Sequence, residues 1–159
     1  MAKGKIKPEL LKTIPYEYPG KKITIDISTD EFTCICPWSG LPDFAKIKIS
    51  YIPRKKCVEL KSLKLYIQSY RNVGIVHESV VNRILSDLFD LMSPVWILVE
   101  AEFNIRGGLK TVVRGERNSL SLKGRGVAVA ATRPIRTGTP RSNSPATGGR
   151  SGASTPMEG

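Results

Sequence analysis

Segments with helical spacing of apolar residues lie in the middle of this chain, and segments with alternating apolar and polar residues lie on both sides of them. The alternation covers 23–27 and 45–51 before the middle, and 95–103 and 109–113 after it. Successive side chains of a strand point to opposite faces of a sheet, so such alternation is typical of strands with one buried face. The pattern predicts four strands in two separate pairs.

The middle of the chain predicts two helices, over 59–70 and 77–92, which end at Asn-Val-Gly (72–74) and at Ser93-Pro94. Their apolar stripes comprise Leu60, Leu63, Ile67 and Tyr70 in the first, and Val81, Ile84, Leu85, Leu88 and Met92 in the second. Residues 32–43 hold two prolines and a glycine and predict a turn-rich loop. The order ββααββ indicates an α+β fold with an antiparallel four-stranded sheet.

Charges favour pairing between the second and third predicted strands. Lys46 and Lys48 share the polar face of one strand, and Glu100 and Glu102 share that of the other, so the two faces would be complementary if the strands pair. About 100 residues around one four-stranded sheet bury only a modest core. The sheet also has two edges to cover. Together these features favour an oligomer.

The last part of the chain differs sharply in composition. Between 131 and 159, 18 of 29 residues are Gly, Pro, Ser or Thr. Such a segment buries too little apolar surface to offset its ordering entropy. We therefore expect a folded domain over 1–114 and a tail over 115–159 that is disordered, with 115–130 as a transition.

The N-terminus has charge but no apolar core of a signal peptide. No apolar run approaches the roughly 18 residues that a membrane helix needs. The chain is therefore expected in the cytoplasm, with its three cysteines as thiols. The formal net charge of +11 attracts anions in general, and the arginines of the tail leave a basic RNA-binding module open as an alternative.

Cys36 is the first candidate for chemistry. It precedes Pro37 in the predicted loop, and Asp43 follows after a Gly and a Pro that could fold the loop back. A thiol beside a carboxyl group suits nucleophilic attack with acid assistance. Alternatively, Cys34 and Cys36 are small buried apolar residues.

Zinc is a second interpretation of the cysteines. Cys34, Cys36, Cys57 and the single His77 supply four ligands, the number that a closed zinc site needs. Their spacing matches no compact zinc motif, yet a zinc-dependent enzyme acting on a pterin or GTP stays open as an alternative.

Other candidate residues surround the predicted helices. His77 and Glu78 open the second helix, where Glu78 either complements the helix dipole or accepts two N–H groups from the edge of a base. Lys61 and Lys64, together with Arg106 before Gly107-Gly108, could form a cationic cradle for phosphates. The chain holds neither GxGxxG nor GxxxxGK[ST], so a nucleotide would be held by side chains and a subunit groove.

Residues 59–66 (ELKSLKLY) resemble the signature of the NADPH-dependent 7-cyano-7-deazaguanine reductases, the nitrile reductases of the queuosine pathway. The loop CPWSGLPDFA at 36–45, the pair His77-Glu78 and Arg-Gly-Gly at 106–108 fit the same family. The resemblance covers roughly 16–114 and is to the short, single-domain type. It implies the tunnelling fold, ββααββ with both helices on one face of the sheet, shared with the distant relative GTP cyclohydrolase I.

The resemblance implies that copies of the chain assemble through a barrel into a decamer of two stacked pentamers, with active sites between subunits. Cys36 would attack the nitrile carbon to give a thioimide, and Asp43 would protonate the nitrogen. The family commonly has Ser where this chain has Leu60. The substrate base would be held by Val58, Glu59, Leu60, His77 and Glu78, and the NADPH phosphates by Lys61, Lys64 and Arg106.

The expected product is 7-aminomethyl-7-deazaguanine, formed with two NADPH and without a metal. The expected substrate is the free base, so no direct contact with nucleic acid is expected, although the product serves tRNA modification.

Overall fold

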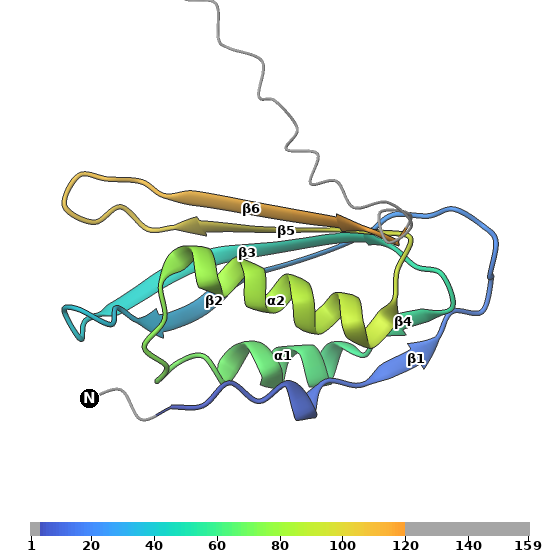
Figure 1. Ribbon diagram of the computed structural model, residues 1–159, viewed down its shortest axis with the longest axis horizontal. Coiled ribbons are helices and arrows are strands. Elements are labelled where there is room, and N and C mark those ends of the chain that lie inside the picture. Colours follow the sequence, from blue (N-terminus) through green and yellow to red (C-terminus); the bar gives the residue numbers. More distant parts are fainter. Residues whose placement is uncertain (1–3, 120–159) are drawn as a thin grey trace, which may run out of the picture. The chain divides into compact units, whose positions relative to one another are not determined.

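The computed structural model describes residues 4–119, so most of the expected tail, from residue 120 onward, lies outside the described residues. Its main feature is a four-stranded antiparallel sheet in the order β2-β3-β5-β6, with both helices on one face (Figure 1). The strands of this sheet are β2 (Ile25–Ile35), β3 (Pro42–Ile52), β5 (Trp96–Phe103) and β6 (Val112–Asn118). The helices are α1 (Leu60–Gln68) and α2 (His77–Met92). The predicted α+β architecture with the order ββααββ is confirmed for the main sheet.

Both helices form where the sequence predicts them. Glu59 caps α1, because its carboxylate accepts hydrogen bonds from the backbone N–H groups of Lys61 and Ser62. The end of α2 is fixed by Ser93, which adopts a left-handed conformation with φ of 49° and donates its N–H to Phe89 O. No helix in the described part of the chain is long and apolar enough to cross a membrane.

The core lies between the helices and one face of the sheet. Alternate residues of β3 and β5 are buried there: Ala45, Ile47, Ile49, Tyr51, Ile97, Val99, Ala101 and Phe103. From α2 the main contributors are Val80, Val81, Ile84, Leu85 and Leu88. Alternate residues of the strands and residues on one face of α2 pack against each other, which gives one continuous apolar layer.

Two predicted boundaries are wrong. The loop expected over 32–43 is only 36–41, because Phe32 and Cys34 are buried and continue β2, while Pro42 opens β3, where a strand tolerates proline. The last strand is Val112–Asn118 and not 109–113, since Gly107 and Gly108 adopt positive φ in a longer turn.

Gly115 therefore lies inside β6 and not in a transition to the tail. A Cβ atom on Gly115 would stand 3.2 Å from side-chain atoms of both Leu85 and Val81 on α2. That distance is shorter than an ordinary van der Waals contact, so glycine lets the helix approach the strand closely.

The expected charge pairing between β3 and β5 is confirmed in register, with Lys46 opposite Glu102 and Lys48 opposite Glu100. The ion pairs go elsewhere, however: Glu102 binds Lys110, and Glu100 binds Arg114 of β6. The complementary faces thus exist, while the close contacts form with residues that follow β5 in the chain.

A small second sheet, which the sequence analysis did not predict, pairs β1 (Thr13–Pro15) with β4 (Lys56–Val58). Three residues are too few to show an alternating pattern. Val58 in β4 is 3% exposed, and its N–H donates to the hydroxyl of Tyr51 at 3.3 Å. This bond ties the chain just before α1 to the far end of β3.

Candidate active site

Cys36 is the first residue after β2 and begins a closed six-residue loop. The Cys36 N–H donates to Leu41 O, and the Gly40 N–H donates to Cys36 O, both at 2.9 Å. Gly40 has a φ of +68°, which favours glycine at this position. These bonds hold Cys36 at a fixed point of the loop that joins β2 to β3.

The surroundings of the Cys36 sulfur favour a thiolate. The pKa of Cys36 is lowered below its usual range, first by a hydrogen bond from the Ser39 hydroxyl and then by the backbone N–H groups of Ser39 and Trp38. Burial and the carboxylate of Asp43 act weakly in the opposite direction. A half-exposed thiol with a lowered pKa has the character of a nucleophile.

Asp43 is the second residue of β3 and its carboxyl group is 8% exposed. Arg106 Nη1 donates to Asp43 Oδ1 at 2.5 Å, and His77 Nε2 lies 3.4 Å from Asp43 Oδ2. Each carboxylate oxygen therefore faces a different nitrogen donor. The second guanidinium nitrogen of Arg106, Nη2, donates to Ser39 Oγ at 2.9 Å.

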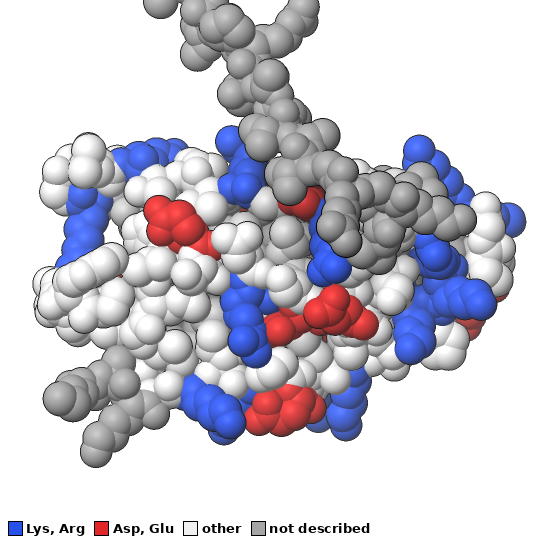
Figure 2. Space-filling model, viewed as in Figure 1, with Lys and Arg blue, Asp and Glu red and all other residues white. Residues whose placement is uncertain are grey.

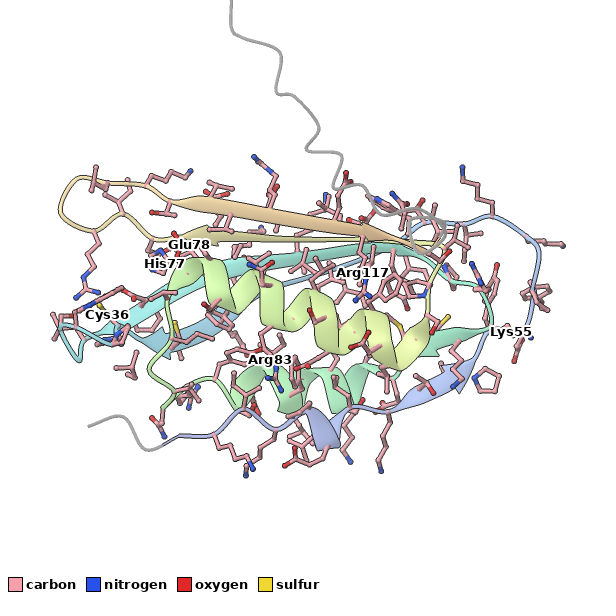
Figure 3. The ribbon with its side chains drawn as sticks, viewed as in Figure 1. Cys36, Lys55, His77, Glu78, Arg83 and Arg117 are labelled. Atoms are coloured by element: carbon pink, nitrogen blue, oxygen red, sulfur yellow. The ribbon has the colours of Figure 1, made fainter. Side chains whose placement is uncertain are left out.

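His77 and Glu78 begin α2 at the same end of the molecule as Cys36 (Figure 3). The His77 imidazole stacks on the buried ring of Phe103, with centroids 3.6 Å apart and planes inclined by 8°. Glu78 is exposed to solvent. The start of the helix thus presents one fixed ring and one accessible carboxylate.

A cavity of about 440 Å³ brings these groups together. Five of the residues predicted from the sequence line it, and these are Cys36, Asp43, His77, Glu78 and Arg106. Trp38, Ser39, Asn104 and Leu109 complete much of its wall. The cavity therefore combines a nucleophile, a carboxyl group, an imidazole and a cation beside one space.

The other predicted site residues, Val58, Glu59, Leu60, Lys61 and Lys64, lie away from this cavity. Val58 is hydrogen-bonded to Tyr51, and Tyr51 lies eight positions after Asp43 along β3. At about 3.3 Å per residue, this length of strand spans about 26 Å. Figure 3 accordingly shows Lys55, just before β4, at the opposite end of the molecule from Cys36.

The predicted site residues at the start of α1 form a second set, which is exposed and carries two lysines. Glu59 accepts N–H bonds from Lys61 at 2.8 Å and from Ser62 at 2.7 Å, and these bonds lower its pKa. Leu60 is 62% exposed, and Lys61 and Lys64 are exposed too. Figure 2 shows Lys and Arg side chains gathered at the end that carries β4.

Arg106 does not join the two lysines in one cradle within a single chain, because its guanidinium is bonded to Asp43 and Ser39. Ser39 is a site residue that the sequence analysis missed. Its position three residues after Cys36, in a loop closed by glycine, is the signal that could have found it.

The four ligands of the zinc alternative do not meet in one chain. Cys57 lies in β4, opposite Ile14, at the end of β3 that is remote from His77. Cys34 is buried in the core under β2. Within 4–119 no three His, Cys, Asp or Glu residues are grouped to hold a metal ion. The donor set proposed for zinc is therefore wrong for the single chain.

Comparisons with known proteins identify the family. A family model described as QueF-like protein matches residues 42–121. The NADPH-dependent 7-cyano-7-deazaguanine reductase of Caldicellulosiruptor bescii is 56% identical over 109 residues, which cover 69% of this chain and 83% of that protein. The enzyme of the same name from Anaeromyxobacter sp. (strain K) is 51% identical over 110 residues, covering 67% of this chain and 90% of that protein.

A solved structure supports the fold. The crystal structure of an archaeosine synthase, QueF-Like, in the apo form matches with a TM-score of 0.54 and 21% identity, over 62% of this chain and 95% of that chain. At this identity the likeness concerns the fold alone. The family model and the curated relatives confirm the resemblance to the NADPH-dependent 7-cyano-7-deazaguanine reductases. The chain belongs to the QueF-like family, which includes the NADPH-dependent 7-cyano-7-deazaguanine reductases.

Proposed function

We propose that this protein reduces the nitrile of 7-cyano-7-deazaguanine to the aminomethyl group, consuming two NADPH for each nitrile. The observation that carries the proposal is the cavity in which the activated thiol of Cys36 faces Asp43 and His77. Relatives more than half identical to this chain bear the name of that activity.

Cys36 begins the reaction. Its sulfur forms a bond to the nitrile carbon while the nitrile nitrogen takes a proton, which gives a thioimide with a C=N double bond. Oδ1 of Asp43 accepts from Arg106, so the proton that Asp43 delivers is carried on Oδ2. His77 Nε2, 3.4 Å from Oδ2, replaces that proton.

NADPH, when bound, supplies one hydride to the thioimide carbon and, as a second molecule, one to the imine carbon. After the first addition the C–S bond breaks, the sulfur of Cys36 leaves as thiolate, and an imine remains. Each hydride is matched by one proton on nitrogen, so the nitrile gains four electrons and four protons in all. A site enclosed between two copies would keep water from the imine, which would otherwise hydrolyse.

The base is held by the start of α2. A carboxylate can accept two N–H groups from the amidine-like edge of a deazaguanine, and the exposed carboxylate of Glu78 opens onto the cavity for this purpose. His77 contacts the same base. Val58, Glu59 and Leu60 complete the pocket, with the free lone pairs of the Glu59 carboxylate as acceptors.

The second set of residues must come from another copy of the chain. A deazaguanine is far shorter than the roughly 26 Å along β3 that separates Asp43 from the neighbourhood of Val58. The exposed Leu60 and the two edge strands β2 and β6 are surfaces through which copies can join. We propose that sheets close into a barrel and that two stacked pentamers form a decamer with interface sites.

The exposed lysines of α1 would hold NADPH. Lys61 and Lys64 are one helical turn apart and suit phosphate groups, and Arg106 of the neighbouring copy would approach them across the interface. The folded domain, proposed as 1–114 from the sequence, extends through β6 to Asn118. The proposed location is the cytoplasm.

The test is the ratio of NADPH oxidised to nitrile consumed. A ratio near two is expected for the four-electron reaction, with 7-aminomethyl-7-deazaguanine identified by mass. Incubation with the nitrile alone should add the substrate mass to the protein, and Cys36→Ala should abolish this adduct. A protein that neither oxidises NADPH with the nitrile nor forms the adduct would contradict the proposal.

A further inference from the structure

We infer that Ser39 is a positioning residue for the Cys36 sulfur and that Arg106 sets the direction of the Ser39 hydroxyl. The inference deepens the proposed function and rests on it only in so far as Cys36 is the nucleophile. It is carried by two hydrogen bonds that the Ser39 oxygen accepts and by the two backbone bonds that close the 36–41 loop, which together limit where the single hydroxyl proton of Ser39 can point.

The acceptor capacity of the Ser39 oxygen is already taken. Arg106 Nη2 donates to Ser39 Oγ at 2.9 Å, and the backbone N–H of Leu41 donates to the same oxygen at 3.3 Å. A serine hydroxyl has two lone pairs and one proton. With both lone pairs occupied by donors, the proton is left to donate.

The acceptor that we infer for that proton is the sulfur of Cys36, because Ser39 and Cys36 belong to the same closed loop and line the same cavity. In agreement with this, the Ser39 hydroxyl and the backbone N–H groups of Ser39 and Trp38 lower the pKa of Cys36. The loop cannot easily move the hydroxyl away, because Gly40 and Leu41 are bonded back to the Cys36 backbone at 2.9 Å. A donor held in place before the reaction stabilises charge on sulfur without reorganising.

Arg106 links this donor to the proton-bearing side of the cavity. One arm of its guanidinium bonds Ser39 and the other bonds Asp43. The rigid fork of arginine fixes both partners in one geometry, which a lysine would not do. One side chain therefore fixes the position of the 36–41 loop relative to the start of β3.

Several titratable or charged side chains lie around the Cys36 loop, and the test must separate them from Ser39. The titratable and charged side chains nearest to it come from β2, β3, α2 and the turn after β5, and they are Cys34, Asp43, His77, Glu78 and Arg106. Substituting Ser39 with alanine removes the hydroxyl donor and one hydrogen bond of Arg106, and it leaves the identity of all five of these groups unchanged.

The experiment measures the rate of Cys36 alkylation by iodoacetamide against pH in the full-length protein, with the modified cysteine located by fragment masses. In Ser39→Ala the midpoint should rise by about one pH unit, which corresponds to the loss of one hydrogen bond to a charged group. Ser39→Thr keeps the hydroxyl and should restore the original midpoint. Ser86→Ala, a change of an exposed serine on α2, is the matched control and should leave it unchanged.

Arg106→Gln tests the second half of the inference. The change should raise the midpoint in the wild-type background, and the rise should shrink in the Ser39→Ala background, because the hydroxyl through which Arg106 acts is absent. Superimposable profiles for wild type and Ser39→Ala would overturn the role of Ser39. Strictly additive effects would overturn the link through Arg106.

These outcomes differ from failure of the proposed function. A shifted midpoint in a protein that never consumes NADPH with the nitrile would sustain the positioning of sulfur and refute the activity. Normal reduction of the nitrile by Ser39→Ala, with an unshifted midpoint, would sustain the activity and refute the positioning.

Discussion

The imidazole of His77 lies flat on the phenyl ring of Phe103, with centroids 3.6 Å apart and planes inclined by 8°. Phe103 ends β5 and is 2% exposed, so its own ring is fixed by the core. The stacking therefore fixes the imidazole plane, and Nε2 stays 3.4 Å from Asp43 Oδ2. A residue of the hydrophobic core thereby determines the direction in which His77 Nε2 points.

Phe103→Leu should lower kcat on the order of tenfold, because small displacements of a reacting group are costly, and should leave KM for NADPH unchanged. Steady-state kinetics measure both. Phe89→Leu, at a buried position on α2, is the control for a general loss of packing. An equal fall in kcat in both variants would show that the stacking on His77 has no specific role.

Asp43→Asn should slow turnover on the order of 100-fold or more, because an amide cannot deliver the proton that the nitrile nitrogen needs. Binding of the nitrile, followed by calorimetry, should change much less. The variant keeps an oxygen for Arg106, so the cavity should retain its shape. Turnover within about twofold of wild type would remove Asp43 from the proton path.

Cys34, in β2, and Cys36, just after it, should differ in their reactivity toward alkylating reagents. The pKa of Cys36 is lowered by Ser39, whereas burial raises that of Cys34 to about 12. A thiol with a lowered pKa keeps its thiolate form at lower pH. When the pH is lowered from 9 toward 6, the midpoint for alkylation of Cys36 should therefore lie below the usual thiol pKa of about 8.5. Cys34 should stay unmodified throughout. Mass mapping over this pH series would contradict the assignment if Cys34 reacted first.

The separation along β3 predicts complementation between inactive variants. Cys36→Ala and Lys61→Ala alter opposite ends of the folded domain. A site built from two copies can therefore combine the intact half of each. Mixing the two proteins under conditions that exchange subunits should restore activity at about a quarter of the sites. Each variant taken alone through the same exchange is the control. No recovery in the mixture would mean that one copy supplies both halves.

Gly115→Ala should destabilise the folded protein by about 1–3 kcal/mol, because the new Cβ would press on Leu85 and Val81 at 3.2 Å. Thermal or urea unfolding measures the loss. Asn118→Ala, an exposed change at the end of the same strand, should alter stability by no more than about 0.5 kcal/mol. Equal stability of both variants would show that α2 can move away from β6 without cost.

Long periodic segments allowed much of the fold to be predicted. The helix over 77–92 has the predicted bounds, and the charges on 45–51 and 95–103 gave the correct neighbouring strands. The three-residue strands β1 and β4 carry too little pattern to be recognised. The sequence predicts Gly115 as the start of the tail, because close packing against α2 leaves no trace in the sequence.

The site was predictable in its residue types but not in its arrangement. The loop around Cys36 and the pair His77-Glu78 indicated one chemistry, and the cavity contains both. Spacing alone could not reveal that Arg106 bonds Asp43 and Ser39 while Lys61 and Lys64 lie elsewhere, because the turn that carries Arg106 is positioned only by the pairing of β5 with β6.

The length of β3 has a practical consequence for anyone who screens variants of this protein. The thiol and the lysine-bearing helix lie at opposite ends of one strand. If two copies complete one site, as proposed, a surface substitution that merely weakens association would depress turnover as severely as a change at Cys36. The specific activity of such a variant should fall when the enzyme is diluted and recover when it is concentrated. The specific activity of a variant with a chemical defect should not depend on enzyme concentration.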